Sequence, residues 1–125
     1  MRFKRVVALF FTMGMVLAVT AYGQGIDSTR AAAERGDPAA QMAMGAFCRH
    51  GMGVPQSDTE AARWYLLAAN QGDAGAQTTV GMLYLSGQGV PQDDVQAKAW
   101  LRKAAKQGDT TAQRQLESLK KPVEE

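Results

Sequence analysis

The chain of 125 residues has few of the side chains from which catalytic and metal sites are built. It has one cysteine, Cys48, which excludes an internal disulfide framework and a zinc site made of cysteines. It has one histidine, His50, which excludes a site made of several histidines. Hydrophobic residues make up 46% and charged residues 21% of the chain, as in a globular domain. We therefore expect one small folded domain without a metal or other cofactor.

The sequence also lacks an apolar run long enough for a membrane helix, which needs about 20 apolar residues. Residues 1–23 instead have a cationic start, an apolar core over 6–19, and small residues ending at Ala21 or Gly23. This layout is typical of a secretory signal peptide. We expect a periplasmic or secreted protein without a membrane span once this segment is removed. An uncleaved leader that tethers the protein to the membrane is the alternative.

The excess of positive charge depends on this leader. Residues 1–23 hold three of the 14 basic residues and none of the 12 acidic ones, so the rest of the chain carries a net charge of −1. The sequence therefore offers no argument for nucleic-acid binding. Residues 24–94 sum to −4 and residues 95–121 to +5. The basic stretch fits a solvated helical surface, or a patch for an acidic partner.

An internal repeat is the strongest feature of the sequence. Residues 36–71 align without gaps on residues 72–107, with 16 identical positions at a period of 36. A third copy begins at Gly108 and stops after one helix, so we interpret 108–121 as a C-terminal capping helix and 122–125 as a tail. Residues 24–35 keep only the end of a preceding unit and are a degenerate half-repeat or linker.

Each unit has the start and stop signals of two helices. Asp37, Asp73 and Asp109 are good N-caps for the first helix. Gly51 and Gly87 suit a left-handed C-cap, and Pro55 and Pro91 prevent the helix from continuing. The second helix begins at SDTE or DDVQ, a capping box or its equivalent. The two helices form a hairpin whose apolar face only the next hairpin can cover.

Small residues recur where two helices would cross. Gly45 and Gly81 stand within apolar helical stripes at a cost of about 1 kcal/mol each, which indicates a close crossing at these points. Trp64 and Trp100 would supply bulk between the layers. The alternation typical of strands is absent. We therefore predict an all-α solenoid of α/α helical hairpins with about five helices.

These motifs resemble the Sel-1-like repeat, a relative of the tetratricopeptide repeat. The resemblance rests on GMGVP and GQGVP, each followed by Trp64 or Trp100 and an Ala-Ala pair, and it covers 36–107 fully. It implies a right-handed superhelix that assembles proteins and whose first helices line a concave face. The third copy departs from the pattern at Glu117 and Lys120, which fits a polar capping helix.

The resemblance places the partner-binding residues beside the glycine of each first helix. They are Met42, Ala46, Arg49, His50, Thr78, Met82, Leu85, Ser86, Arg114 and Ser118. Met42, Met82 and Leu85 lie off the core stripe, which favours a binding surface. Packing against the edge of a neighbouring helix is the alternative.

The sequence gives little support for catalysis. Cys48 and His50 are two residues apart on a helix and so point in different directions, and Cys48 stands at a core position. The paired acids Asp93 and Asp94 precede a helix, where capping explains them. GMGVP and GQGVP lack the context of a phosphate-binding loop.

The leading hypothesis is an exported, non-catalytic module that binds a protein or peptide in a short concave groove. The alternatives are a periplasmic inhibitor or immunity protein that neutralises a toxic enzyme, and an enzyme acting on cell-wall or β-lactam substrates. End-to-end self-association is a further alternative, because the open ends of solenoids can stack.

Overall fold

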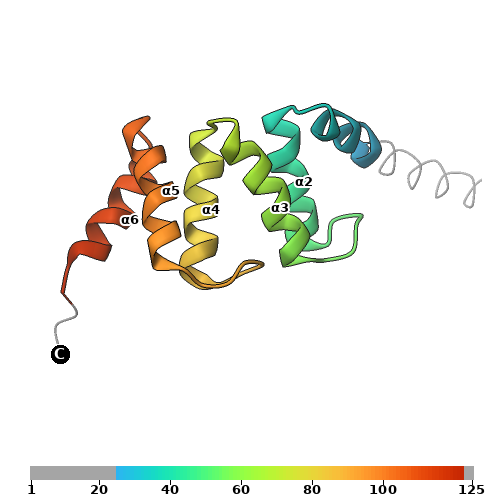
Figure 1. The fold of residues 1–125 in the computed structure, drawn as a ribbon. Coiled ribbons are helices and arrows are strands. Elements are labelled where there is room, and N and C mark those ends of the chain that lie inside the picture. Colours follow the sequence, from blue (N-terminus) through green and yellow to red (C-terminus); the bar gives the residue numbers. More distant parts are fainter. Residues whose placement is uncertain (1–24, 123–125) are drawn as a thin grey trace, which may run out of the picture.

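The computed structural model describes residues 25–122, and this part of the chain is helical with short connections (Figure 1). Residues 25–34 form a helical segment that precedes the first repeat. Five helices follow: α2 (Pro38–His50), α3 (Asp58–Asn70), α4 (Ala74–Ser86), α5 (Asp94–Lys106) and α6 (Thr110–Lys120). The all-α prediction is confirmed, while the signal-peptide interpretation of 1–23 lies outside the described residues.

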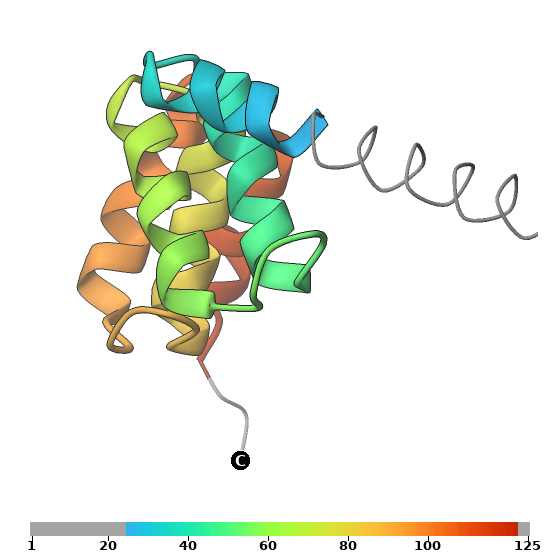
Figure 2. The same cartoon turned by 90° about the vertical axis from the view of Figure 1, so that its right-hand side faces the viewer.

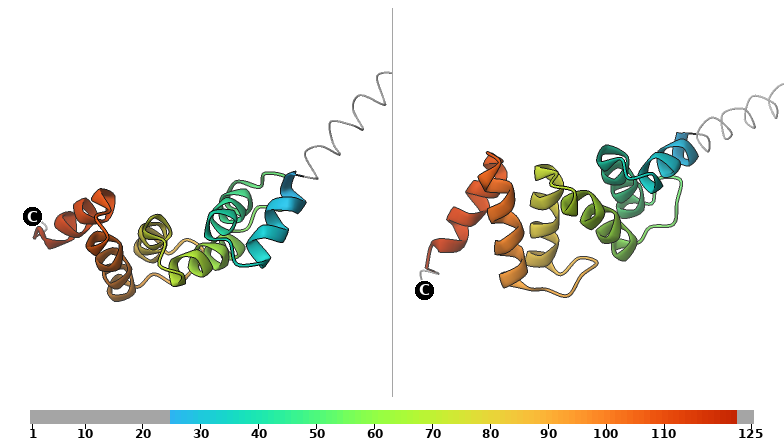
Figure 3. Two further views of the ribbon diagram at one scale, coloured as in Figure 1. Left: turned by 90° about the horizontal axis from the view of Figure 1, so that it is seen from above. Right: turned by 45° about the horizontal axis from the view of Figure 1, so that its top comes forward.

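Consecutive helices pack against one another in a curved row (Figures 1 and 2). Seen from above, α2, α4 and α6 follow the inner side of the row, and α3 and α5 follow the outer side (Figure 3, left). The inner helices are the first helices of the units. The helices therefore form the solenoid of stacked hairpins that the sequence repeat predicts. Within 25–122, no helix combines the length and apolar character that crossing a bilayer requires.

The caps explain where the inner helices begin and end. The Asp37 carboxylate accepts from the backbone N–H of Ala39 and Ala40, and the same cap recurs at Asp73 and Asp109. Gly51 ends α2 with a φ of 65° and Gly87 ends α4 with a φ of 72°. This left-handed geometry costs other residues strain, so glycine sets both stop points.

The cap of α3 is only half of the expected capping box. The backbone N–H of Glu60 donates to Ser57 Oγ at 3.2 Å, as a capping box requires. The Glu60 carboxylate, however, pairs with Arg63 at 2.9 Å. The Ser57 N–H donates to the carbonyl of Cys48, so it needs no carboxylate from Glu60.

The two mid-helix glycines are points of close crossing, as predicted. A Cβ built on Gly45 would lie 2.5 Å from Cε1 of Tyr65, and one on Gly81 would lie 2.7 Å from Cγ of Leu101. Tyr65 and Leu101 occupy equivalent positions on the second helix of each unit. Both are buried, and each packs directly on the glycine backbone.

The core consists of clusters that join neighbouring units. Trp64 is half-buried and contacts two of these clusters, one centred on Met44 and the other on α3 and α4. Trp100 is also half-buried, with the Lys103 ammonium 4.4 Å from its ring centroid. The tryptophans are therefore only partly covered by the layers they contact, and most of the buried apolar residues are alanines.

Two buried glutamines, Gln41 and Gln77, bond each repeat to the unit before it, which was not predicted from the sequence. Gln41 Nε2 donates to the carbonyl of Ala33 at 3.1 Å, and Gln71 Nε2 donates to Gln41 Oε1 at 2.8 Å. The same pair of bonds recurs one unit later, where Gln77 donates to Ala69 and Gln107 donates to Gln77. We call these bonds the glutamine ladder.

Candidate binding groove

A groove opens on the inner side of the row and is centred on α4. It has a volume of about 360 Å³. Its lining residues come from the end of α2, from α4, from the loop after α4 and from the start of α6: Arg49, Thr78, Thr79, Met82, Leu83, Ser86, Gln88 and Thr111. Three successive units thus contribute to one surface, because their first helices stand side by side along the inner face.

One wall of the groove is formed by a contact between two units. Arg49 Nη2 donates to Gln88 Oε1 at 3.3 Å, which joins the end of α2 to the loop after α4. Arg49 also acts on the buried Tyr65 below it. Burial raises the pKa of Tyr65 above its usual value, and the positive charge of Arg49 opposes part of that rise. Arg49 is exposed, so its remaining N–H groups can reach a ligand.

The floor of the groove contains a polar atom without a partner. Thr78 is 8% exposed, and among the described residues its Oγ1 has no hydrogen-bond partner. The adjacent Thr79 differs, because its hydroxyl donates to the carbonyl of Gly75 at 2.9 Å. A buried polar group without a partner costs about 1–3 kcal/mol. The hydroxyl has less than 1 Å² of accessible surface, so a ligand can bond it only after the Thr78 side chain rotates toward the groove, and such a bond would remove that cost.

Apolar contact is available beside this hydroxyl. Met82 is 38% exposed and is one of the few large apolar side chains on the surface of residues 25–122. Leu83 also lines the groove but is buried in the core, so its position is fixed. A flexible methionine next to a fixed leucine can adapt to different apolar side chains.

The structure brings together four of the residues that the family resemblance assigned to binding: Arg49, Thr78, Met82 and Ser86. Met42 and Leu85 pack against core clusters instead, at the edges of neighbouring helices. The remaining four do not line the groove: half-buried Ala46 and exposed His50, Arg114 and Ser118.

Several lining residues were missed in the sequence analysis. Gln88 lies in the loop after α4 and Thr111 in the first turn of α6, and neither stands beside a helix glycine. Their place in the groove depends on how successive units are stacked. The identity of Gln88 carried no signal, since the equivalent residue in the first unit is Met52.

The described residues offer little for catalysis or metal binding. Cys48 is buried and free, and burial raises the pKa of its thiol above the usual value. His50 is exposed at the end of α2. Over residues 25–122, no three histidine, cysteine, aspartate or glutamate side chains gather as a metal site would require.

Comparisons with known proteins agree with this architecture. The family model described as Sel1 repeat matches residues 38–73 and 74–109, two units with the same period of 36. A solved structure, a Sel1 repeat protein from Oxalobacter formigenes, is 45% identical with a TM-score of 0.70. The match covers 73% of this chain and 26% of that protein, so this chain spans about a quarter of its length. No curated protein matches the sequence.

More than half of the chain thus matches the family model, and the arrangement of its helices matches a solved member. Such repeats generally mediate interactions between proteins and are typically not catalytic. The chain therefore belongs to the Sel1 repeat family.

Proposed function

We propose that the protein binds a segment of another protein in the inner groove around α4. The groove to which three successive units contribute, with the exposed Met82 and Arg49 in its lining, is the observation that carries this proposal. The buried, unpartnered hydroxyl of Thr78 lies in the same lining. The proposed role is that of a non-catalytic interaction module.

The lining defines the chemistry of the ligand. A polypeptide backbone supplies both donors and acceptors, and either could bond Thr78 Oγ1 once that side chain rotates toward the groove. An apolar side chain of the ligand would pack on Met82, and a carbonyl or carboxylate would accept from Arg49. The scaffold is already folded, so binding would cost little ordering entropy in the protein.

A peptide selection followed by targeted substitutions tests the groove. Peptides would be selected from a random display library on the purified protein and then measured individually by fluorescence anisotropy. We expect Met82→Asp to weaken the selected peptides by about tenfold or more, because the new charge would have to be desolvated against an apolar side chain. The circular dichroism spectrum should stay helical, since Met82 contributes to no core cluster.

A matched control is Met52→Asp, which changes an exposed methionine that does not line the groove. This substitution should leave the affinity unchanged. Selected peptides that bind the Met82→Asp variant as well as the original protein would place the binding surface elsewhere and contradict the proposal.

We further propose that the protein acts after export to the periplasm or the medium. The support is the cationic start, apolar core and small residues of 1–23. The mass of the intact protein recovered from the envelope or the medium should match a chain that begins near residue 22 or 24. A full-length mass in the membrane fraction would favour the tethered alternative.

A further inference from the structure

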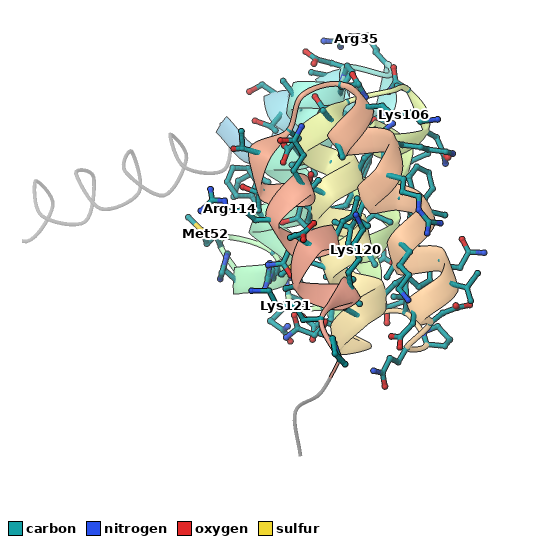
Figure 4. The ribbon with its side chains drawn as sticks, turned by 90° about the vertical axis from the view of Figure 1, so that its left-hand side faces the viewer. Arg35, Met52, Lys106, Arg114, Lys120 and Lys121 are labelled. Atoms are coloured by element: carbon teal, nitrogen blue, oxygen red, sulfur yellow. The ribbon has the colours of Figure 1, made fainter. Side chains whose placement is uncertain are left out.

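A second cleft, separate from the inner groove, lies between α5 and α6. It has a volume of about 230 Å³ and is lined by Lys98 and Arg102 of α5 and by Leu116, Leu119 and Lys120 of α6. Three cations therefore surround two leucines. In the view onto the α6 end, Lys120 lies on the side of α6 that faces α5, and Arg114 lies on the other side (Figure 4).

The repeat shows what this layer contains one unit earlier. The residues 36 positions before Lys98, Arg102 and Lys120 are Ala62, Leu66 and Tyr84. Ala62 belongs to the core cluster between α3 and α4, and the other two pack against it. The same layer is thus apolar and closed between α3 and α4, but cationic and open between α5 and α6.

The leucines of the cleft are less covered than their counterparts. Leu116 and Leu119 correspond to Val80 and Leu83 of the preceding unit. Val80 is 1% and Leu83 5% exposed, whereas both leucines of α6 are only partly buried. The apolar surface that a neighbouring helix covers in the earlier unit is therefore accessible here.

The charge of the cleft is largely uncompensated. Lys120 pairs with Glu117 at 3.6 Å, but both side chains are mostly exposed, so the pair is weak. Neither Lys98 nor Arg102 forms an ion pair within 25–122. Three nearby positive charges around an apolar floor favour a ligand that brings negative charge and apolar side chains together.

We propose that this cleft binds an acidic, leucine-bearing segment of a protein partner. The leucines of the segment would pack on Leu116 and Leu119, and its carboxylates would accept from Lys98, Arg102 and Lys120. A phosphate group or a nucleic-acid backbone would use the cations but leave the leucines uncovered. The chemistry of the cleft therefore fits an acidic peptide better than either of these.

The test uses a fluorescein-labelled synthetic peptide built from repeats of Glu-Leu-Leu-Glu, titrated with the full chain. The double variant Lys98→Ala with Arg102→Leu installs the residues of the preceding unit, so it should fold as the original does. We expect it to weaken binding by about tenfold or more, and Lys106→Ala, which changes a cation outside the cleft, by less than about twofold. Added salt should weaken binding to the original protein.

Three results would overturn the proposal. Lys106→Ala could weaken peptide binding as much as the double variant does, or the double variant could bind the peptide as tightly as the original protein. Inorganic phosphate or phosphatidylglycerol vesicles could also displace the peptide. A peptide with lysine in place of glutamate should not bind. If the double variant loses its helical circular dichroism, the binding experiment uses a second double variant, Lys98→Gln with Arg102→Gln, in its place. Met82→Asp should leave this binding unchanged, so failure of the inner groove and failure of this cleft are distinguishable.

Discussion

Gly81 lies directly beneath Leu101, so that the side chain of α5 rests on the bare backbone of α4. A Cβ at Gly81 would be 2.7 Å from Leu101 Cγ and 3.2 Å from the carbonyl oxygen of Ala97. The first neighbour is the branch point of a fully buried side chain and the second is backbone, so neither can move away freely. The equivalent contact between Gly45 and Tyr65 shows that this spacing belongs to the repeat.

Gly81→Ala should therefore destabilise the protein, although alanine normally favours a helix by about 1 kcal/mol. Overpacking costs about 1–3 kcal/mol, so we expect a net loss of about 1–2 kcal/mol in the free energy of unfolding. Urea denaturation followed by circular dichroism measures it. Gly75→Ala in the same helix is the control, since its Cβ would meet only the Asp73 carboxylate at 3.3 Å. A gain in stability from Gly81→Ala would show that the crossing is looser than described.

The glutamine ladder makes a second prediction. Gln77 is buried, donates to Ala69 at 3.3 Å and accepts from Gln107 at 2.9 Å. Gln77→Ala should lower the free energy of unfolding by about 1–3 kcal/mol, because it leaves a cavity and removes both bonds. Gln107→Ala should lower the free energy of unfolding by less than Gln77→Ala does, since Gln107 is exposed. Thermal unfolding of both single variants and the double variant measures the coupling, and strict additivity would contradict a ladder.

Thr78→Val separates stability from binding. Valine has nearly the shape of threonine but no hydroxyl, so it removes a buried polar atom that has no partner among the described residues. We expect the melting temperature to stay the same or to rise. The peptides selected on the inner groove should bind less tightly, because they lose a hydrogen bond. A fall in melting temperature would mean that the hydroxyl already has a stabilising partner.

Burial predicts slow chemistry at Cys48. Desolvation raises the pKa of its thiol, with Glu60 adding to the rise and Arg30 opposing it, so less thiolate is present than for an exposed cysteine. Alkylation by iodoacetamide at pH 8 should be much slower for the folded protein than for the protein in urea. Equal rates would show that Cys48 is accessible.

The same shift has a consequence for stability at high pH. A raised pKa means that the folded state holds the proton more tightly than the unfolded state. The stabilisation is complete below the unfolded pKa and is lost as pH rises through the folded pKa, which lies above the ordinary pKa of a cysteine thiol. The melting temperature should therefore fall in alkaline solution, and Cys48→Ala should reduce that fall. Tyr65 should contribute in the same direction at still higher pH.

The helices could be predicted because their signals are local. Asp37 and Gly51 mark the two ends of α2, and the mid-helix position of Gly45 indicated a crossing that Tyr65 fills. The buried glutamines could not be predicted in the same way, since glutamine is usually a surface residue. A signal existed nevertheless, because the three copies share glutamine at 41, 77 and 113.

The groove was harder to predict than the fold because it depends on contacts between units. Arg49 and Gln88 are 39 residues apart and meet only after the hairpins have stacked. Met42 and Leu85 have the same apolar character as Met82, yet only Met82 remains accessible in the groove. Whether a side chain of one helix is exposed depends on how the neighbouring unit packs against it, and the apolar pattern of that helix alone does not show this.

The glutamine ladder also restricts how such a chain can change in length. Each rung joins an atom in one unit to atoms eight residues before it and thirty residues after it, at Gln41 and again at Gln77. A duplicated block of 36 residues would reproduce every rung. One residue inserted into α3 would shift Gln71 along and around the helix axis, out of reach of Gln41. Insertions and deletions of whole 36-residue units should therefore be tolerated far better than those of other lengths.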